Sequence, residues 1–134
     1  MNICFTDIDG VLNPKFSKKW SKKSISIYNR MCKDFNLICV VTSTWRTNHT
    51  IEQLQKIFDE QGVTVKIYDY TPHLIEDRGL EIEQWLRENK WTKYCVLDDD
   101  CYQIKKYVTN VVDCRSWEGI QEDQYDEVKK IFNI

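Results

Sequence analysis

Residues 2–12 read NICFTDIDGVL, a short apolar run that leads into two acidic residues and a glycine. The branched and aromatic side chains of this run, which is too short for a helix, predict a strand over residues 2–6. Asp7 and Asp9 are two positions apart, so in an extended chain their side chains project to the same side. Gly10 then permits a sharp turn. The stretch predicts a strand that delivers two carboxylates into one pocket; an Asp-Gly turn with incidental acids is the competing interpretation.

Short apolar runs of the same kind recur along the chain. They occupy residues 37–42, 63–68, 94–97 and 109–112. Apolar residues at spacings of three and four predict helices between and after these runs. The helical patterns cover residues 25–35, 51–58, 80–86 and 125–132. Parallel strands need crossover connections, so the alternation predicts an α/β fold, a Rossmann-like three-layer α/β/α sandwich with a central, mainly parallel five-stranded sheet.

Length and composition limit the organisation of the protein. The 134 residues, of which 42% are hydrophobic, suffice for one domain with a substantial core, so we expect a single domain over residues 1–134 without a large cap domain. No apolar run approaches the roughly 20 residues of a membrane span, and the first residues do not resemble a secretory signal. We therefore expect a cytoplasmic protein without a membrane partner. The six cysteines lack a Cys-x-x-Cys pair, which favours buried thiols over a zinc site.

In parallel sheets the ligand crevice lies outside the carboxyl ends of the strands, so the polar residues that follow each run are candidates for a site. Thr42 and Ser43 follow the second run, where hydroxyls that open a helix either bind an anion or serve as ordinary N-caps. Arg78 precedes the third helical pattern and is either a surface residue or a cation for a phosphoryl group.

Three adjacent acids, Asp98, Asp99 and Asp100, directly follow the fourth run. Beside Asp7 and Asp9 they would repel one another strongly unless a cation were present. A carboxylate-rich, all-oxygen site suits Mg²⁺ rather than zinc. The sequence therefore predicts Mg²⁺ as a cofactor.

Taken in order, these motifs resemble the haloacid dehalogenase-like (HAD) superfamily over essentially the whole chain. They are Asp-x-Asp-Gly-Val after the first strand, a hydroxyl after the second, a basic residue before a helix and an acidic pair after the fourth strand. The stretches TSTWR at 42–46, RG at 78–79 and LDDD at 97–100 are most similar to the compact, capless HAD domains associated with RNA repair, the "Swiss army knife" type.

The resemblance implies roles for two aspartates. Asp7 would attack phosphorus and form an aspartyl-phosphate. Asp9 would protonate the leaving oxygen and then activate the water that hydrolyses the intermediate. An acid at position 9 favours a phosphatase over the dehalogenase branch of the superfamily.

It also implies a phosphate site and a metal site. Thr42, with Ser43 as its neighbour, would bind the phosphoryl oxygens, and Arg78 occupies the position where the family usually has lysine. The residues expected to hold Mg²⁺ are Asp7, Asp9 through its backbone carbonyl, and Asp99, with Asp98 in support. Which of the three adjacent acids is the direct ligand stays open.

Residues 10–23 are expected to form a flap near the pocket. Lysines and aromatic residues crowd this segment, which is either a solvated basic surface or a flap that attracts anions. The residues assigned to a substrate flap and pocket entrance are Lys15, Lys18, Lys19, Trp20 and Arg46. Trp45 and Trp117 are also candidates to line the entrance, but core or rim packing is the preferred role for both.

An uncovered site can admit a large substrate. Positive charge with stacking rings favours DNA or RNA ends, so we expect a polynucleotide end phosphatase that acts on a 3′-phosphate. A phosphatase of nucleotides or other small metabolites is the first alternative. A catalytically idle domain that binds phosphorylated partners and a receiver-like domain are the others. The oligomeric state is left open.

Overall fold

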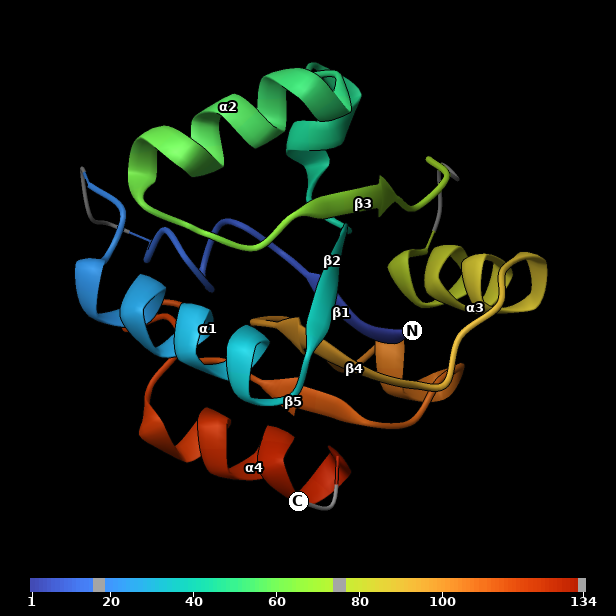
Figure 1. The fold of residues 1–134 in the computed structure, drawn as a ribbon. Helices are drawn as coiled ribbons and strands as arrows, with labels where there is room; N and C mark the ends of the chain where they lie inside the picture. The colour runs from blue at the N-terminus through green and yellow to red at the C-terminus, as the bar shows by residue number, and fades with distance from the viewer. Residues whose placement is uncertain (16–18, 74–76, 133–134) are drawn as a thin grey trace.

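The computed structural model describes residues 1–15, 19–73 and 77–132, which form a parallel sheet covered by helices on both faces (Figure 1). The strands are β1 (Asn2–Thr6), β2 (Leu37–Val41), β3 (Ile67–Tyr70), β4 (Lys93–Asp98) and β5 (Val111–Asp113). They pair in the order β3-β2-β1-β4-β5, and every pair is parallel. This arrangement confirms the predicted Rossmann-like sandwich. The strand order places β1 at the centre of the sheet, and no cap domain is inserted in the described residues.

The helices divide between the two faces as the alternation of side chains along β1 requires. The helices are α1 (Lys22–Asp34), α2 (Ile51–Gln61), α3 (Arg78–Glu88) and α4 (Glu122–Phe132), with short 3₁₀ helices η1 (Thr44–Thr47) and η2 (Ile104–Lys106). Cys4 points into the larger core with α1, α2 and α4, whereas Ile3 and Phe5 point into a second core with α3 and η2. Each predicted helix is present.

The third strand begins later than the sequence predicted. The apolar run 63–68 led us to expect a strand there, but the ladder covers Ile67–Tyr70. Val63 is buried, but it belongs to the turn that ends α2 and not to the strand. Its N–H donates to the carbonyl of Phe58, and Gly62, the C-cap of α2, has a φ of 85°. Apolar character at this point marks burial beneath a helix and not strand pairing.

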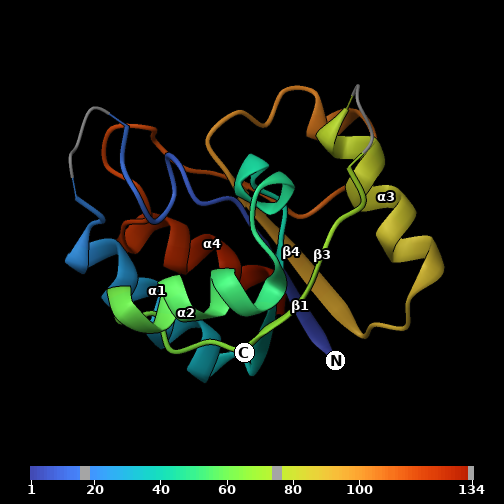
Figure 2. The same ribbon diagram turned by 90° about the horizontal axis from the view of Figure 1, so that it is seen from above.

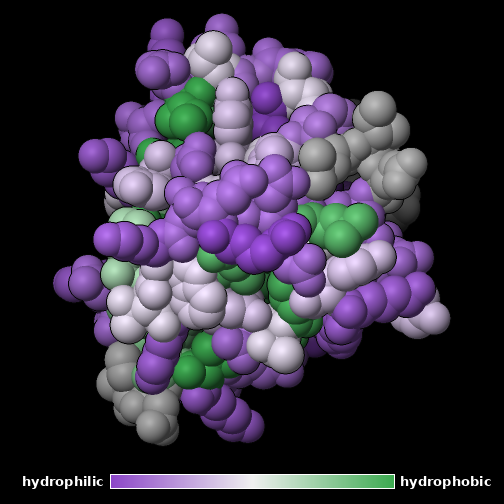
Figure 3. All heavy atoms as spheres, turned by 90° about the vertical axis from the view of Figure 1, so that its right-hand side faces the viewer, coloured by the Kyte–Doolittle hydropathy of each residue, from purple (hydrophilic) through white to green (hydrophobic). Residues whose placement is uncertain are grey.

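The surface that carries α3 is hydrophilic over most of its area and shows only small, separate hydrophobic patches (Figure 3). None of the helices in the described ranges combines the length and the apolar character that crossing a membrane requires.

Arg46 has a different place from the one predicted. We assigned it to the pocket entrance, but its side chain is 4% exposed and donates to the carbonyls of Thr42 (2.7 Å), Ser43 (2.8 Å) and Thr71 (3.1 Å). Its Nη2 also forms an ion pair of 2.8 Å with Oε2 of Glu81, which is equally buried. The entrance assignment is therefore wrong: Arg46 links the ends of β2 and β3 to the first turns of α3.

This link predicts a large loss of stability for Glu81→Gln. The substitution keeps the shape of the side chain but leaves the buried guanidinium of Arg46 without its counter-charge, so we expect the free energy of unfolding to fall by about 3 kcal/mol. Glu83→Gln is the matched control on the same helix, because the Glu83 pair with Arg87 is exposed and 3.7 Å long. It should change stability by less than about 0.5 kcal/mol. Urea unfolding of both variants measures the difference, and equal losses would contradict the role given to Arg46.

Candidate functional site

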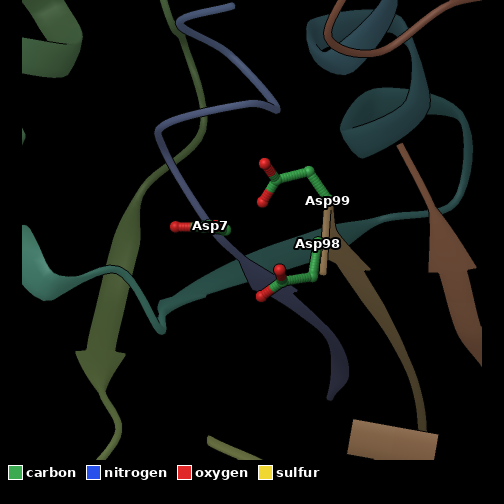
Figure 4. Close-up of side chains that lie close together, drawn as sticks. All are labelled: Asp7, Asp98 and Asp99. Carbon is green, nitrogen blue, oxygen red and sulfur yellow. The ribbon is translucent and has the colours of Figure 1, made fainter. Parts of the chain in front are cut away.

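Three carboxylates converge where β1 and β4 end. Thr6 of β1 pairs with Leu97 of β4, and the N–H of Asp7 continues the ladder to the carbonyl of Leu97 at 3.1 Å. This register places Asp7 beside Asp98 and Asp99, and one oxygen from each of the three lies within 4.8 Å of the others. Figure 4 shows the three side chains directed toward one space. The structure thus brings these predicted site residues together.

Arg78 lies at the same point. It opens α3, whose N-cap Asp77 accepts a hydrogen bond from the N–H of Gly79. Its Nη1 is 2.8 Å from Oδ2 of Asp98 and 3.1 Å from Oδ2 of Asp7. A basic residue before the third large helix therefore reaches the carboxylates, as the sequence predicted.

Asp99 is held from the other side. Lys15 Nζ forms an ion pair of 2.9 Å with its Oδ2, and Ser116 Oγ donates to the same oxygen at 2.8 Å. Gly10, with a φ of 82°, packs so closely that a Cβ there would lie 2.3 Å from Oδ2 of Asp99. The segment after β1 and the loop after β5 meet here, where Lys15 N–H donates to the carbonyl of Ser116 (Figure 2).

These surroundings shift the pKa values of the three acids differently. Burial, with the carboxylate of Asp98 adding to it, raises the pKa of Asp7 to about 7, although Arg78 opposes this shift. Burial also raises the pKa of Asp98 against the opposing effect of Arg78. Burial would do the same at Asp99, but Lys15 and Ser116 outweigh it and lower the pKa of that acid. The shifts at Asp7 and Asp98 therefore favour a cation or a proton at this site near neutral pH.

The donor set fits a hard divalent ion. Three carboxylates close enough to share one ion provide the oxygen ligands that Mg²⁺ prefers. The contacts of Lys15 and Ser116 both go to Oδ2 of Asp99, and neither involves Oδ1. Asp100 lies outside the group, and its N–H donates to Oδ1 of Asp98.

Asp9 does not join the other carboxylates. Its Oδ2 accepts a hydrogen bond from the indole N–H of Trp45 at 3.0 Å, and its Oδ1 accepts one from the amide of Asn13 at 3.1 Å. The expectation of a common direction for Asp7 and Asp9 was wrong because the chain stops being extended at Ile8, whose carbonyl accepts from three following N–H groups. The proposed proton transfer by Asp9 and metal contact through its carbonyl remain predictions.

The two predicted hydroxyls have different surroundings. Thr42 Oγ1 is buried and has no hydrogen-bond partner among the described residues. A buried hydroxyl without a partner is unfavourable, and an oxygen of a bound phosphoryl group would satisfy it. Ser43, by contrast, caps η1, because its side chain accepts from the N–H of Trp45. Capping, the alternative interpretation, thus describes Ser43.

The residues of the predicted flap have different surroundings. Lys15 reaches the site, and Lys19 is exposed. Trp20 is half-buried and packs edge-on against Trp45 and Phe58, with ring centroids 5.6 and 6.0 Å away, so it belongs to the packing of the fold. Lys18 lies outside the described residues.

Sequence reasoning missed Asn13 and Ser116, which contact the site acids, and gave Trp45 a packing role without its hydrogen bond to Asp9. Ser116 follows β5 by three positions, so the rule about strand ends could have identified it. Asn13 and Trp45 reach Asp9 because of the turn after β1. Gly10 indicated a turn there, but the sequence does not show which side chains the turn brings to Asp9.

Comparison with known proteins gives one match. A family model described as "HAD domain in Swiss Army Knife RNA repair proteins" matches residues 3–125. Neither the curated proteins nor the solved structures contain a significant match to the chain. The matched range includes all the acids and cations described above.

The raised pKa of Asp7 predicts an unusual pH dependence without metal. A proton that the folded state holds up to about pH 7 stabilises the fold at low pH, and this stabilisation is lost as the pH rises from the ordinary value of 3.8 through about 7. In EDTA, Asp7→Asn should therefore become more stable than the wild type above pH 7, by more than about 1.4 kcal/mol, which is the free energy of one pKa unit. Below pH 4 the advantage should vanish.

Thermal unfolding in EDTA and in Mg²⁺ between pH 4 and 8 measures this effect. Mg²⁺ should raise the melting temperature of the wild type most above pH 7, because the ion competes with the proton. It should raise that of Asp7→Asn much less. A wild type whose stability responds to Mg²⁺ equally at pH 5 and pH 8 would contradict the assignment.

Proposed function

Because the chain belongs to the family of HAD domains in Swiss Army Knife RNA repair proteins, we propose that it is a Mg²⁺-dependent phosphomonoesterase acting on phosphorylated nucleic-acid ends. The family implies a phosphatase-type function in RNA repair. The observation that carries the specific proposal is the convergence of Asp7, Asp98 and Asp99 with Arg78 at the ends of β1 and β4.

In the proposed reaction Asp7 supplies the nucleophile. One of its oxygens bonds to phosphorus while the bond to the leaving oxygen breaks, and the electron pair of that bond goes to the leaving oxygen. Asp9 donates a proton to that oxygen, then takes a proton from the water that attacks the aspartyl-phosphate. As the water oxygen bonds to phosphorus, the bond between phosphorus and the Asp7 oxygen breaks. Its electron pair returns to Asp7, and phosphate is released.

The remaining residues of the site bind and orient the phosphoryl group. Thr42 Oγ1 would donate to a phosphoryl oxygen, and Arg78, already beside Asp7, would pair with a second one. Asp7, Asp99 and the carbonyl of Asp9 would hold Mg²⁺ with support from Asp98. When bound, the ion supplies positive charge against the negative charge that develops on the phosphoryl oxygens.

We propose a large substrate for this site. No cap domain covers it in the described residues, and Arg78 also lines an open hollow of about 260 Å³ with Asp77, Asp100 and Gln103. Lys15 adds an ammonium group that is half exposed beside Asp99. These features fit the entry of a strand end, and we propose a 3′-phosphate on RNA or DNA as the substrate.

One observation favours a second candidate, a phosphatase of mononucleotides. Trp20 was expected to stack on a base of a bound strand, but its ring packs against Trp45 and Phe58. A substrate with a single base needs fewer stacking partners than a strand does.

Phosphate release from a 3′-phosphorylated oligonucleotide, its 5′-phosphorylated isomer and the matching mononucleotide tests the proposal. In Mg²⁺ we expect kcat/KM to be at least about 10-fold higher for the 3′-phosphorylated oligonucleotide, the difference that about 1.4 kcal/mol of added transition-state binding gives. Asp7→Asn should lower kcat by about 1,000-fold or more, because it removes the nucleophile. EDTA should lower kcat similarly.

Asp126→Asn is the matched control, because Asp126 is an exposed acid on α4. It should retain full activity. Preference for the mononucleotide would establish the second candidate instead. If none of these substrates nor p-nitrophenyl phosphate releases phosphate in Mg²⁺, the catalytic proposal fails.

A further inference from the structure

Two neutral N–H donors from different parts of the chain hold the carboxyl group of Asp9. The indole of Trp45, on η1, bonds to Oδ2 at 3.0 Å, and the amide of Asn13, in the turn after β1, bonds to Oδ1 at 3.1 Å. Both oxygens are thus oriented, and the carboxyl group is held apart from the three that would share the ion. Its position depends on Trp45 and Asn13.

Trp45 is itself firmly placed. Its backbone N–H donates to Ser43 Oγ, and its ring stacks on His49, whose Nδ1 is 2.8 Å from the Trp45 carbonyl oxygen. Trp20 packs edge-on against the same ring and against Phe58 beneath it. An indole fixed on two sides presents its N–H at one point, so orienting Asp9 requires little further loss of side-chain freedom.

We propose that Trp45 is a positioning residue, whose indole N–H fixes the carboxyl group of Asp9 where it transfers a proton to the leaving oxygen. The inference rests on the proposed phosphatase function. Each carboxyl oxygen has two lone pairs, so an oxygen that accepts from Trp45 can still carry the transferred proton. A displacement of about 1 Å of a catalytic group can lower a rate about 100-fold.

The role has a consequence that depends on the leaving group. When the phosphorus–oxygen bond breaks, its electron pair goes to the leaving oxygen. A sugar hydroxyl is a poor leaving group without a proton, so its departure needs a well-placed acid. p-Nitrophenolate is stable as an anion and leaves without one. Trp45 should therefore matter for sugar phosphates and not for p-nitrophenyl phosphate.

Trp45→Phe tests this selectivity, because phenylalanine keeps an aromatic ring against Trp20 and His49 but has no N–H. We expect kcat/KM, which covers the steps through phosphorus–oxygen cleavage, to fall about 30- to 100-fold for a 3′-phosphorylated oligonucleotide. For p-nitrophenyl phosphate it should change less than about 3-fold. Asn13→Ala, which removes the other donor, should show the same selectivity and serves if Trp45→Phe does not fold.

Two further variants separate positioning from general damage. In an Asp9→Asn background, Trp45→Phe should cause no additional loss on the oligonucleotide, because the two residues act as one unit. Trp91→Phe is the matched control. Trp91 also donates its indole N–H, to the carbonyl of Leu86, but it lies just before the start of β4, at the end of that strand remote from the site. It should leave both substrates unaffected.

The outcomes distinguish the inference from the function on which it rests. Equal losses on both substrates, no loss on either, or a loss that adds to that of Asp9→Asn would each overturn the positioning role while leaving a phosphatase in place. A wild type that releases no phosphate from p-nitrophenyl phosphate or the oligonucleotide in Mg²⁺ would instead overturn the proposed function.

Discussion

The mutual repulsion of buried carboxylates is the constraint on which the rest of this structure depends. Asp7, Asp98 and Asp99 share a space less than 5 Å across because two neighbouring parallel strands end together. Like charges in such a space are unfavourable by several kcal/mol unless cations or protons offset them. Arg78 and Lys15 supply two positive charges, and burial together with the carboxylate of Asp98 still raises the pKa of Asp7. A divalent ion would complete the balance.

The same constraint explains why segments far from β1 and β4 lie where they do. α3 contributes Arg78 from its first position, and the Arg46–Glu81 pair ties that end of α3 to the loop that presents Thr42. The chain after β1 brings Lys15 to Asp99, which the absence of a side chain at Gly10 allows. The loops at the carboxyl ends of the strands are thus held in place by ion pairs and hydrogen bonds to the site acids and their partners.

The sequence predicted the fold and the members of the carboxylate cluster, because both follow from local patterns. Strand and helix periods determined the sandwich, and the rule that ligands bind at strand ends selected Asp7, Asp98 and Asp99. Predictions that needed tertiary packing were less accurate. Arg46 and Trp20 are residue types that often bind substrates. The neighbouring sequence does not show that Arg46 pairs with buried Glu81 or that Trp20 packs against Phe58. Val63 likewise looks like strand sequence but packs below α2.

The divergence of Asp7 and Asp9 shows how a turn can assign different chemistry to two identical side chains. Period-two alternation would direct both into one space, where a fourth carboxylate would add to the repulsion. The turn at Ile8 instead sends Asp9 to Trp45 and Asn13, which donate hydrogen bonds and carry no charge. In the proposed mechanism, this separation would leave nucleophilic attack to Asp7 and proton transfer to Asp9.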